Sequence, residues 1–125
     1  MRIRSTSKVD APSWSRLRCA LWPGDEAEHA LNVRRFLDGK LEEPTAVWVA
    51  EEAGDLIGFI ELSIRAYAEG CNSDHVGYVE GWYVSPAARG RGVGRALIVA
   101  AEDWARSEGC GFQETGQIRC YRKAL

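Results

Sequence analysis

One segment constrains the fold more than any other: a run of alternating glycines that separates a strand-like stretch from an amphipathic one. Residues 76–84 are rich in β-forming side chains and end at Ser85-Pro86. Residues 93–108 repeat apolar side chains at the three- and four-residue spacing of a single helix face, with Gly109 after them. The sequence therefore predicts a strand, a tight turn and a helix, in that order.

The turn between these two elements has the composition of a phosphate site. It reads Arg89-Gly90-Arg91-Gly92-Val93-Gly94-Arg95. The first amide N–H groups of a helix lack internal partners and lie at its positive end, and glycine leaves the backbone open to an anion. The spacing differs from a Walker loop, which needs Lys-Ser/Thr after its last glycine, and from the G-x-G-x-x-G of dinucleotide folds. The alternative is a glycine-rich surface turn with exposed arginines.

Apolar periodicity and turn residues predict the other elements. Helices are expected from Asp10 to Trp22 and from Asp25 to Asp38, each with an aspartate placed to cap or charge its first turn. Shorter elements are strands over 3–5, 45–51 and 56–66, a loop over 67–75, and a hairpin about Thr115-Gly116. A chain of 125 residues is long enough for one core, so residues 1–125 are expected to form a single domain.

Charge is unevenly distributed along the chain. Residues 1–88 carry 9 basic and 14 acidic side chains, whereas residues 89–125 carry 7 basic and 4 acidic ones. This suits an anionic cofactor near the C-terminal part and a cationic substrate near the N-terminal part, although uneven surface scatter would give the same counts. No basic stripe for nucleic acid, no membrane-length apolar run and no secretory signal is present, so a cytoplasmic protein is expected.

The four cysteines do not form a metal or disulfide pattern. No C-x-x-C pair occurs, and only two histidines accompany them. We therefore expect reduced thiols and no metal.

Two carboxylates fall within the predicted strands. Glu80 lies between Tyr78 and Trp82 in an apolar strand, where burying an unpaired carboxylate is costly. It therefore indicates a cationic ligand or a water-filled cleft, or else a buried structural ion pair. Glu61 lies on the more polar face of the preceding strand and is expected to be solvated.

The glycine-arginine turn matches a known signature. Residues 89–94 fit the Q/R-x-x-G-x-G/A pattern, so the chain resembles the GNAT superfamily of acyl-CoA N-acyltransferases. The resemblance implies an α+β (α/β) fold in which helices flank a mixed, largely antiparallel sheet with a V-shaped acetyl-CoA cleft. The implied cofactor-binding residues comprise the strand end and the turn: Trp82, Tyr83, Val84, Arg89, Gly90, Arg91, Gly92, Val93, Gly94 and Arg95.

A narrower resemblance covers nearly the whole chain. Leu21-Trp22-Pro23-Gly24, Val79-Glu80-Gly81 and Tyr121-Arg122-Lys123 are similar to segments of aminoglycoside 6'-N-acetyltransferases, which are antibiotic-resistance enzymes. This implies a homodimer that acetylates a cationic drug with acetyl-CoA. The implied substrate-binding residues are Trp22, Asp25, Tyr67 and Glu80, with Glu80 also the catalytic base or orienting group.

Several alternatives stay open at this point. Trp22 could be a core residue, and Tyr67 a loop aromatic that covers the core. The acceptor could be a polyamine, a peptide or another amine instead of an aminoglycoside. A non-catalytic acyl-CoA-binding module is a third hypothesis. No pair of cysteine and histidine suggests a covalent intermediate, so direct acetyl transfer is the expected chemistry.

The chain departs from the family pattern at one junction. GNAT domains have another strand and helix between the helix of the pyrophosphate site and the terminal hairpin, but here Gly111 follows Cys110 directly. A connection through a helix needs about 10–12 residues. Either the protein carries further residues at this junction, which is our expectation, or the domain is truly shortened.

Overall fold

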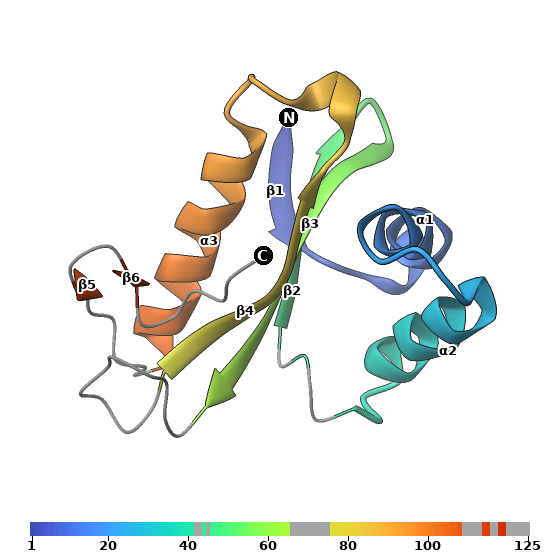
Figure 1. The fold of residues 1–125 in the computed structure, drawn as a ribbon, viewed down its shortest axis with the longest axis horizontal. Coiled ribbons are helices and arrows are strands. Elements are labelled where there is room, and N and C mark those ends of the chain that lie inside the picture. The colour runs from blue at the N-terminus through green and yellow to red at the C-terminus, as the bar shows by residue number, and fades with distance from the viewer. Residues whose placement is uncertain (42–43, 45, 66–75, 109–113, 116–117, 120–125) are drawn as a thin grey trace.

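The fold is a four-stranded antiparallel sheet with helices on both of its faces, as the computed structural model shows (Figure 1). The structure describes residues 1–41, 44, 46–65, 76–108, 114–115 and 118–119. The sheet order is β1-β2-β3-β4, formed by Arg2–Ser5, Ala46–Glu52, Asp55–Arg65 and Val76–Val84. Among the described strands, β4 is the last one of this sheet.

Turn chemistry fixes the hairpin between β2 and β3. Ala53 and Gly54 both have positive φ, 53° and 80°, as a tight two-residue hairpin turn requires. A second hairpin pairs β5 (Glu114–Thr115) with β6 (Ile118–Arg119), which confirms the one predicted at this point of the chain.

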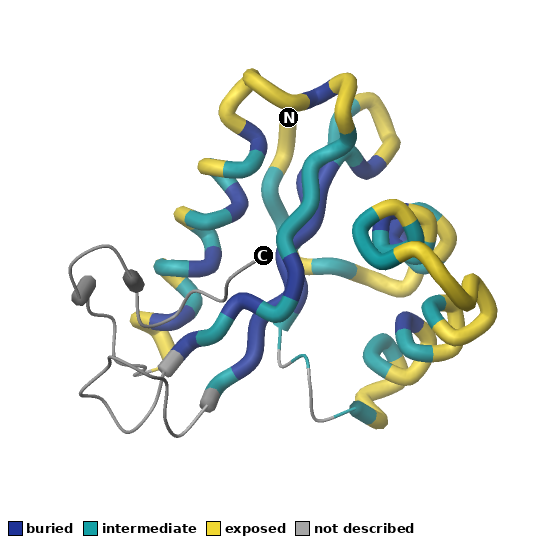
Figure 2. The backbone as a smooth tube through the Cα atoms, in the orientation of Figure 1, coloured by how far each residue is buried: buried dark blue, intermediate teal, exposed yellow. Residues whose placement is uncertain are grey.

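Three long helices cover the sheet. The helix α3 (Val93–Ser107) lies on one face, whereas α1 (Ala11–Leu21) and α2 (Glu26–Leu37) lie on the other (Figure 1). Short 3-10 turns, η1 (Lys8–Asp10) and η2 (Pro86–Ala88), precede α1 and α3. Figure 2 shows the burial that results, with the middle of the sheet buried from both sides.

Each face has its own hydrophobic core. On the α3 side, Ile60, Leu62 and Leu97 are no more than 1% exposed. On the α1–α2 side, Trp14 and Phe59 are equally buried. Because both faces are covered, Glu61 and Ser63, which β3 directs towards α1 and α2, are only 2% and 0% exposed.

A β-bulge in β4 decides where the Glu80 carboxylate points. Glu61 pairs with Gly81 and Leu62 pairs with Val79, so Glu80 has no residue opposite it in β3. An extra residue of this kind reverses the side-chain alternation locally. Trp82 and Val79 therefore both pack on the α3 side, and Glu80 turns towards the α1–α2 side.

The predicted helices and strands agree with the structure to within a few residues, and the predicted loop over 67–75 lies outside the described residues. Asp10, however, has a different role from the one expected. Its side chain caps nothing in α1. Instead it is 5% exposed, and both its oxygens accept hydrogen bonds from Arg4, at 2.7 and 2.8 Å. The Arg4 guanidinium lowers the pKa of Asp10. The pair ties β1 to the start of α1.

No helix among the described residues is long and apolar enough to cross a membrane.

Candidate active site

A pocket of about 480 Å³ opens where the end of α1, the end of β4 and the start of α3 meet. We call it the turn pocket; it is lined by Ala20, Leu21, Trp82, Tyr83, Val84, Arg89 and Gly94. Five of these residues, from Trp82 to Gly94, are among the predicted cofactor-binding residues. The strand end and the glycine turn thus contribute to a single cavity.

The backbone of the turn is arranged to receive an anion. Gly90 and Gly92 have left-handed φ values of 82° and 84°, and a Cβ at either position would meet nothing within 4 Å. At this end of α3 the Ala96 amide bonds to the Gly92 carbonyl at 3.0 Å. The amides of residues 93–95 precede this bond and point out of the helix end, where a phosphate can accept from them. The site therefore fits the pyrophosphate of an acyl-CoA.

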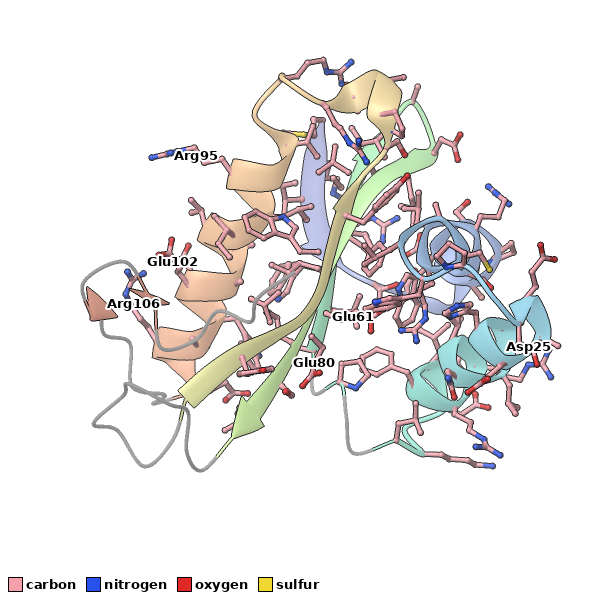
Figure 3. All side chains as sticks on the ribbon, in the orientation of Figure 1. Asp25, Glu61, Glu80, Arg95, Glu102 and Arg106 are labelled. Carbon is pink, nitrogen blue, oxygen red and sulfur yellow. The ribbon has the colours of Figure 1, made fainter. Side chains whose placement is uncertain are left out.

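The three arginines of the turn have different surroundings. Arg89 lines the turn pocket, donates from Nε to the Val84 carbonyl at 2.8 Å, and lies 5.4 Å from the Tyr83 ring centre. Arg91 pairs with Glu52 at 2.6 Å and lowers the pKa of that carboxyl. Arg95 points away from the sheet on the outer side of α3 (Figure 3). Arg89 is thus the arginine that contacts the strand end.

A second pocket, of about 410 Å³, lies between the sheet and the two N-terminal helices. We call it the carboxylate pocket; it is lined by Trp14, Arg18, Trp22, Asn32, Phe36, Leu41, Pro44, Glu61 and Glu80. Leu21 and Trp22, which are consecutive, line different pockets, and so do Glu80 and Trp82 on β4. The two pockets therefore lie close together, near the end of α1 and the middle of β4.

Glu80 is half-buried and lines the carboxylate pocket, where its position in an apolar strand indicated a cleft or an ionic partner. The hydroxyl of Ser63, which is fully buried on β3, donates to Glu80 Oε1 at 2.7 Å. Figure 3 shows Glu80 on the same side of the sheet as Glu61. The bond fixes one carboxylate oxygen in the pocket wall.

The expectation that Glu61 is solvated was wrong. Glu61 is 2% exposed, its carboxylate lies 2.5 Å from Arg18 Nη1, and it accepts a hydrogen bond from Trp14 Nε1 at 3.1 Å. Burial raises the pKa of Glu61, against the opposing attraction of Arg18. The cause of the error is that α1 covers this face of β3.

Trp22 lines the carboxylate pocket, consistent with the prediction made for it. The edge of its ring packs directly on Gly81, where a Cβ would lie 2.8 Å from Cζ2 of the indole. The Arg18 guanidinium lies over the ring at 5.0 Å from the centre. The glycine of the Glu80-Gly81 pair is thus what lets the indole approach the strand.

Asp25, a predicted substrate residue, does not line either of these two pockets. Asp25 is the N-cap of α2, accepts a hydrogen bond from the Glu28 amide at 3.2 Å, and is exposed. Figure 3 places it away from Glu61 and Glu80. Tyr67 lies outside the described residues.

The sequence analysis did not identify Arg18 and Ser63 as parts of the site. For Arg18 a signal existed, because it shares a face of the predicted helix with Trp14 and Leu17. A cation on an apolar helix face indicates a buried anionic partner. In the part of the chain that is described, no group of three or more histidine, cysteine, aspartate or glutamate side chains could hold a metal ion.

Comparison with known proteins gives a consistent result. The model of the acetyltransferase (GNAT) family matches residues 11–125. An aminoglycoside N(6')-acetyltransferase type 1 of Klebsiella aerogenes is 44% identical, with 98% of this chain and 96% of the relative covered. One from Stenotrophomonas maltophilia is 40% identical, with 98% and 93% covered.

A solved structure shares the fold. The structure of AAC(6')-Iy in complex with the bisubstrate analogue CoA-S-monomethyl-acetylneamine has a TM-score of 0.79 and 32% identity, covering 99% of this chain and 98% of that one.

Proposed function

This chain belongs to the acetyltransferase (GNAT) family, and we propose that it transfers the acetyl group of acetyl-CoA to the 6'-amine of aminoglycosides. The similarity to aminoglycoside N(6')-acetyltransferases over almost the full length of both chains supports the substrate class. The two pockets support the chemistry, because one suits a phosphate-bearing cofactor and the other presents a carboxylate to a cation.

The turn pocket is proposed to bind acetyl-CoA. Backbone amides at the start of α3 would hold the pyrophosphate, with Gly90 and Gly92 leaving the approach open. The end of β4, from Trp82 to Val84, would lie along the pantetheine arm. A backbone N–H near Val84 would donate to the thioester carbonyl and stabilise the charge that develops on its oxygen.

The carboxylate pocket is proposed to bind the acceptor, with Glu80 as the group that handles its proton. An ammonium cannot attack a thioester, so the site must take a proton from the amine before or during transfer. Glu80 lines the carboxylate pocket, two residues before Trp82 of the turn pocket, and one of its oxygens is held by Ser63. Trp22 supplies an apolar wall to this pocket.

The observation that carries this proposal is that neighbouring residues of α1 and β4 line the two pockets, with Glu80 in the wall of the carboxylate pocket. The test is to titrate acetyl-CoA into the protein, add an aminoglycoside, and follow release of the coenzyme thiol. An aminoglycoside with a hydroxyl in place of its 6'-amine is the matched control. We expect thiol release with the first drug and none with the second. Binding of acetyl-CoA without release for any amine would instead support a non-catalytic binding module.

We also propose that residues 1–125 are a single GNAT domain that lacks a strand–helix segment between Cys110 and Gly111. The alignment with the Klebsiella relative runs over 146 positions, which exceeds the 125 residues of this chain, so some positions have no counterpart here. The intact mass of the isolated protein distinguishes the two readings of this junction. A mass near 13.9 kDa indicates a truly shortened domain, and a larger mass indicates further residues.

Location and assembly complete the proposal. A cytoplasmic enzyme would have access to acetyl-CoA, and the family resemblance favours a homodimer. Light scattering of the purified protein measures its oligomeric state, and a monomer would contradict the proposed homodimer.

A further inference from the structure

Arg18 is a charged residue of the carboxylate pocket to which the proposed reaction gives no role. Its side chain is 12% exposed and contacts three groups at once. Nη1 pairs with the Glu61 carboxylate at 2.5 Å, Nε donates to His29 Nδ1 at 3.3 Å, and the guanidinium plane lies over the Trp22 ring. All three contacts converge on the wall that would face the acceptor.

We propose that Arg18 is a positioning residue for acceptor binding: it holds the Trp22 ring in the wall of the carboxylate pocket. The inference rests on the proposed function, since it concerns the acceptor of that reaction. It adds a determinant of amine binding that lies on α1, outside the strand and turn that carry the chemistry.

The contacts of Trp22 support the proposal that Arg18 holds its ring in place. The edge of its ring meets Gly81, its face meets Arg18, and its backbone carbonyl lies 2.8 Å from His29 Nε2. Because Arg18 Nε donates to Nδ1 of His29, Nε2 carries the ring proton and donates to that carbonyl. Arg18 therefore restrains Trp22 twice, once through its ring and once through its main chain.

The test separates the positioning of Trp22 from the stability of the fold. Arg18→Met alone leaves a buried charge unpaired and could unfold the protein, so the informative variant is the double change Arg18→Met with Glu61→Gln, compared with Glu61→Gln alone. The matched control is Arg4→Met with Asp10→Asn, which removes the other buried arginine–carboxylate pair, outside both pockets. Each protein is measured for melting temperature, for acetyl-CoA Kd, and for KM and kcat with an aminoglycoside.

We expect the Arg18→Met/Glu61→Gln variant to raise the acceptor KM roughly five- to tenfold above Glu61→Gln, with the acetyl-CoA Kd unchanged. The control pair should lower the melting temperature and leave the acceptor KM within about twofold of wild type. An acceptor KM equal to that of Glu61→Gln would overturn the inference, as would an equal rise in the control pair. Failure of the proposed function looks different, because the wild-type chain would then release no thiol with any aminoglycoside.

Discussion

The turn pocket and the carboxylate pocket lie close together, yet they are built in different ways. The turn pocket is formed largely by one continuous stretch, from the end of β4 to the start of α3, and the backbone provides its expected ligand groups. The carboxylate pocket is formed by side chains from four elements, and its central ion pair joins residues 43 positions apart. A local motif can specify the first kind of site, whereas the second depends on how helices pack on a sheet.

This difference predicts that changes in one pocket leave the other nearly intact. Backbone changes at the glycine turn should act on acetyl-CoA, and side-chain changes around Glu80 and Trp22 should act on the acceptor. The following variants test that separation.

The largest effect is expected from Glu80→Gln. The amide keeps the shape of the side chain but cannot accept a proton from the amine, so kcat should fall by about 10²-fold or more. The acetyl-CoA Kd should stay near the wild-type value, as measured by calorimetry. Turnover equal to wild type would remove Glu80 from the reaction.

Gly81→Ala should act on the same pocket through shape. The added methyl group would overlap the Trp22 ring, so the ring must shift away from β4. We expect the acceptor KM to rise by about tenfold and stability to fall by about 1–3 kcal/mol, with acetyl-CoA binding unaffected. Steady-state kinetics and thermal unfolding measure both quantities. A loss of acetyl-CoA affinity as large as the rise in acceptor KM would show that the pockets are not separable.

Gly92→Ala tests the turn pocket, and Gly54→Ala is its matched control. The two glycines have φ values of 84° and 80°, and neither has an atom within 4 Å of the position of a Cβ. Each substitution should therefore cost a similar strain, about 1 kcal/mol. Gly92→Ala should also weaken acetyl-CoA binding by about three- to tenfold, because the amides at the start of α3 move. Equal affinities in the two variants would argue against the turn as the phosphate site.

The smallest effect concerns pH and Glu61. Burial raises the folded-state pKa of Glu61, so the folded protein holds this proton more tightly than the unfolded chain does. Wild type therefore loses this stabilising contribution as pH rises from about 4.3 through the folded-state value. Glu61→Gln lacks the titrating group, so its stability relative to wild type should increase with pH. Urea unfolding at pH 4 to 8 measures the difference, and a difference that decreases with pH would contradict the assignment.

The family, the fold class and the acetyltransferase activity predicted from the sequence are confirmed by the comparisons. The turn from Arg89 to Arg95 made this possible, because its glycines and the following amphipathic helix are adjacent in the chain. The strand that contains Glu80 was also predicted, because it comes shortly before this turn in the chain.

Long-range packing explains what the sequence analysis missed. Glu61 has a polar strand neighbour at Ser63, so its face was interpreted as solvated, and only the position of α1 over β3 changes that. The bulge at Glu80 is likewise a property of the pairing between β3 and β4 and has no local signal. Asp10 has the local sequence context of a helix cap. Its actual partner, Arg4, belongs to the preceding strand, and the local sequence does not reveal that pairing.

The central claim is that the two pockets hold the two substrates on either side of Glu80. A crystal structure with coenzyme A tests it most directly. The pyrophosphate is expected within hydrogen-bond distance of the amides of Val93, Gly94 and Arg95, with the thiol end directed past Val84 and Trp82 towards Glu80. Coenzyme A bound away from this turn, or with its thiol end far from Glu80, would contradict it.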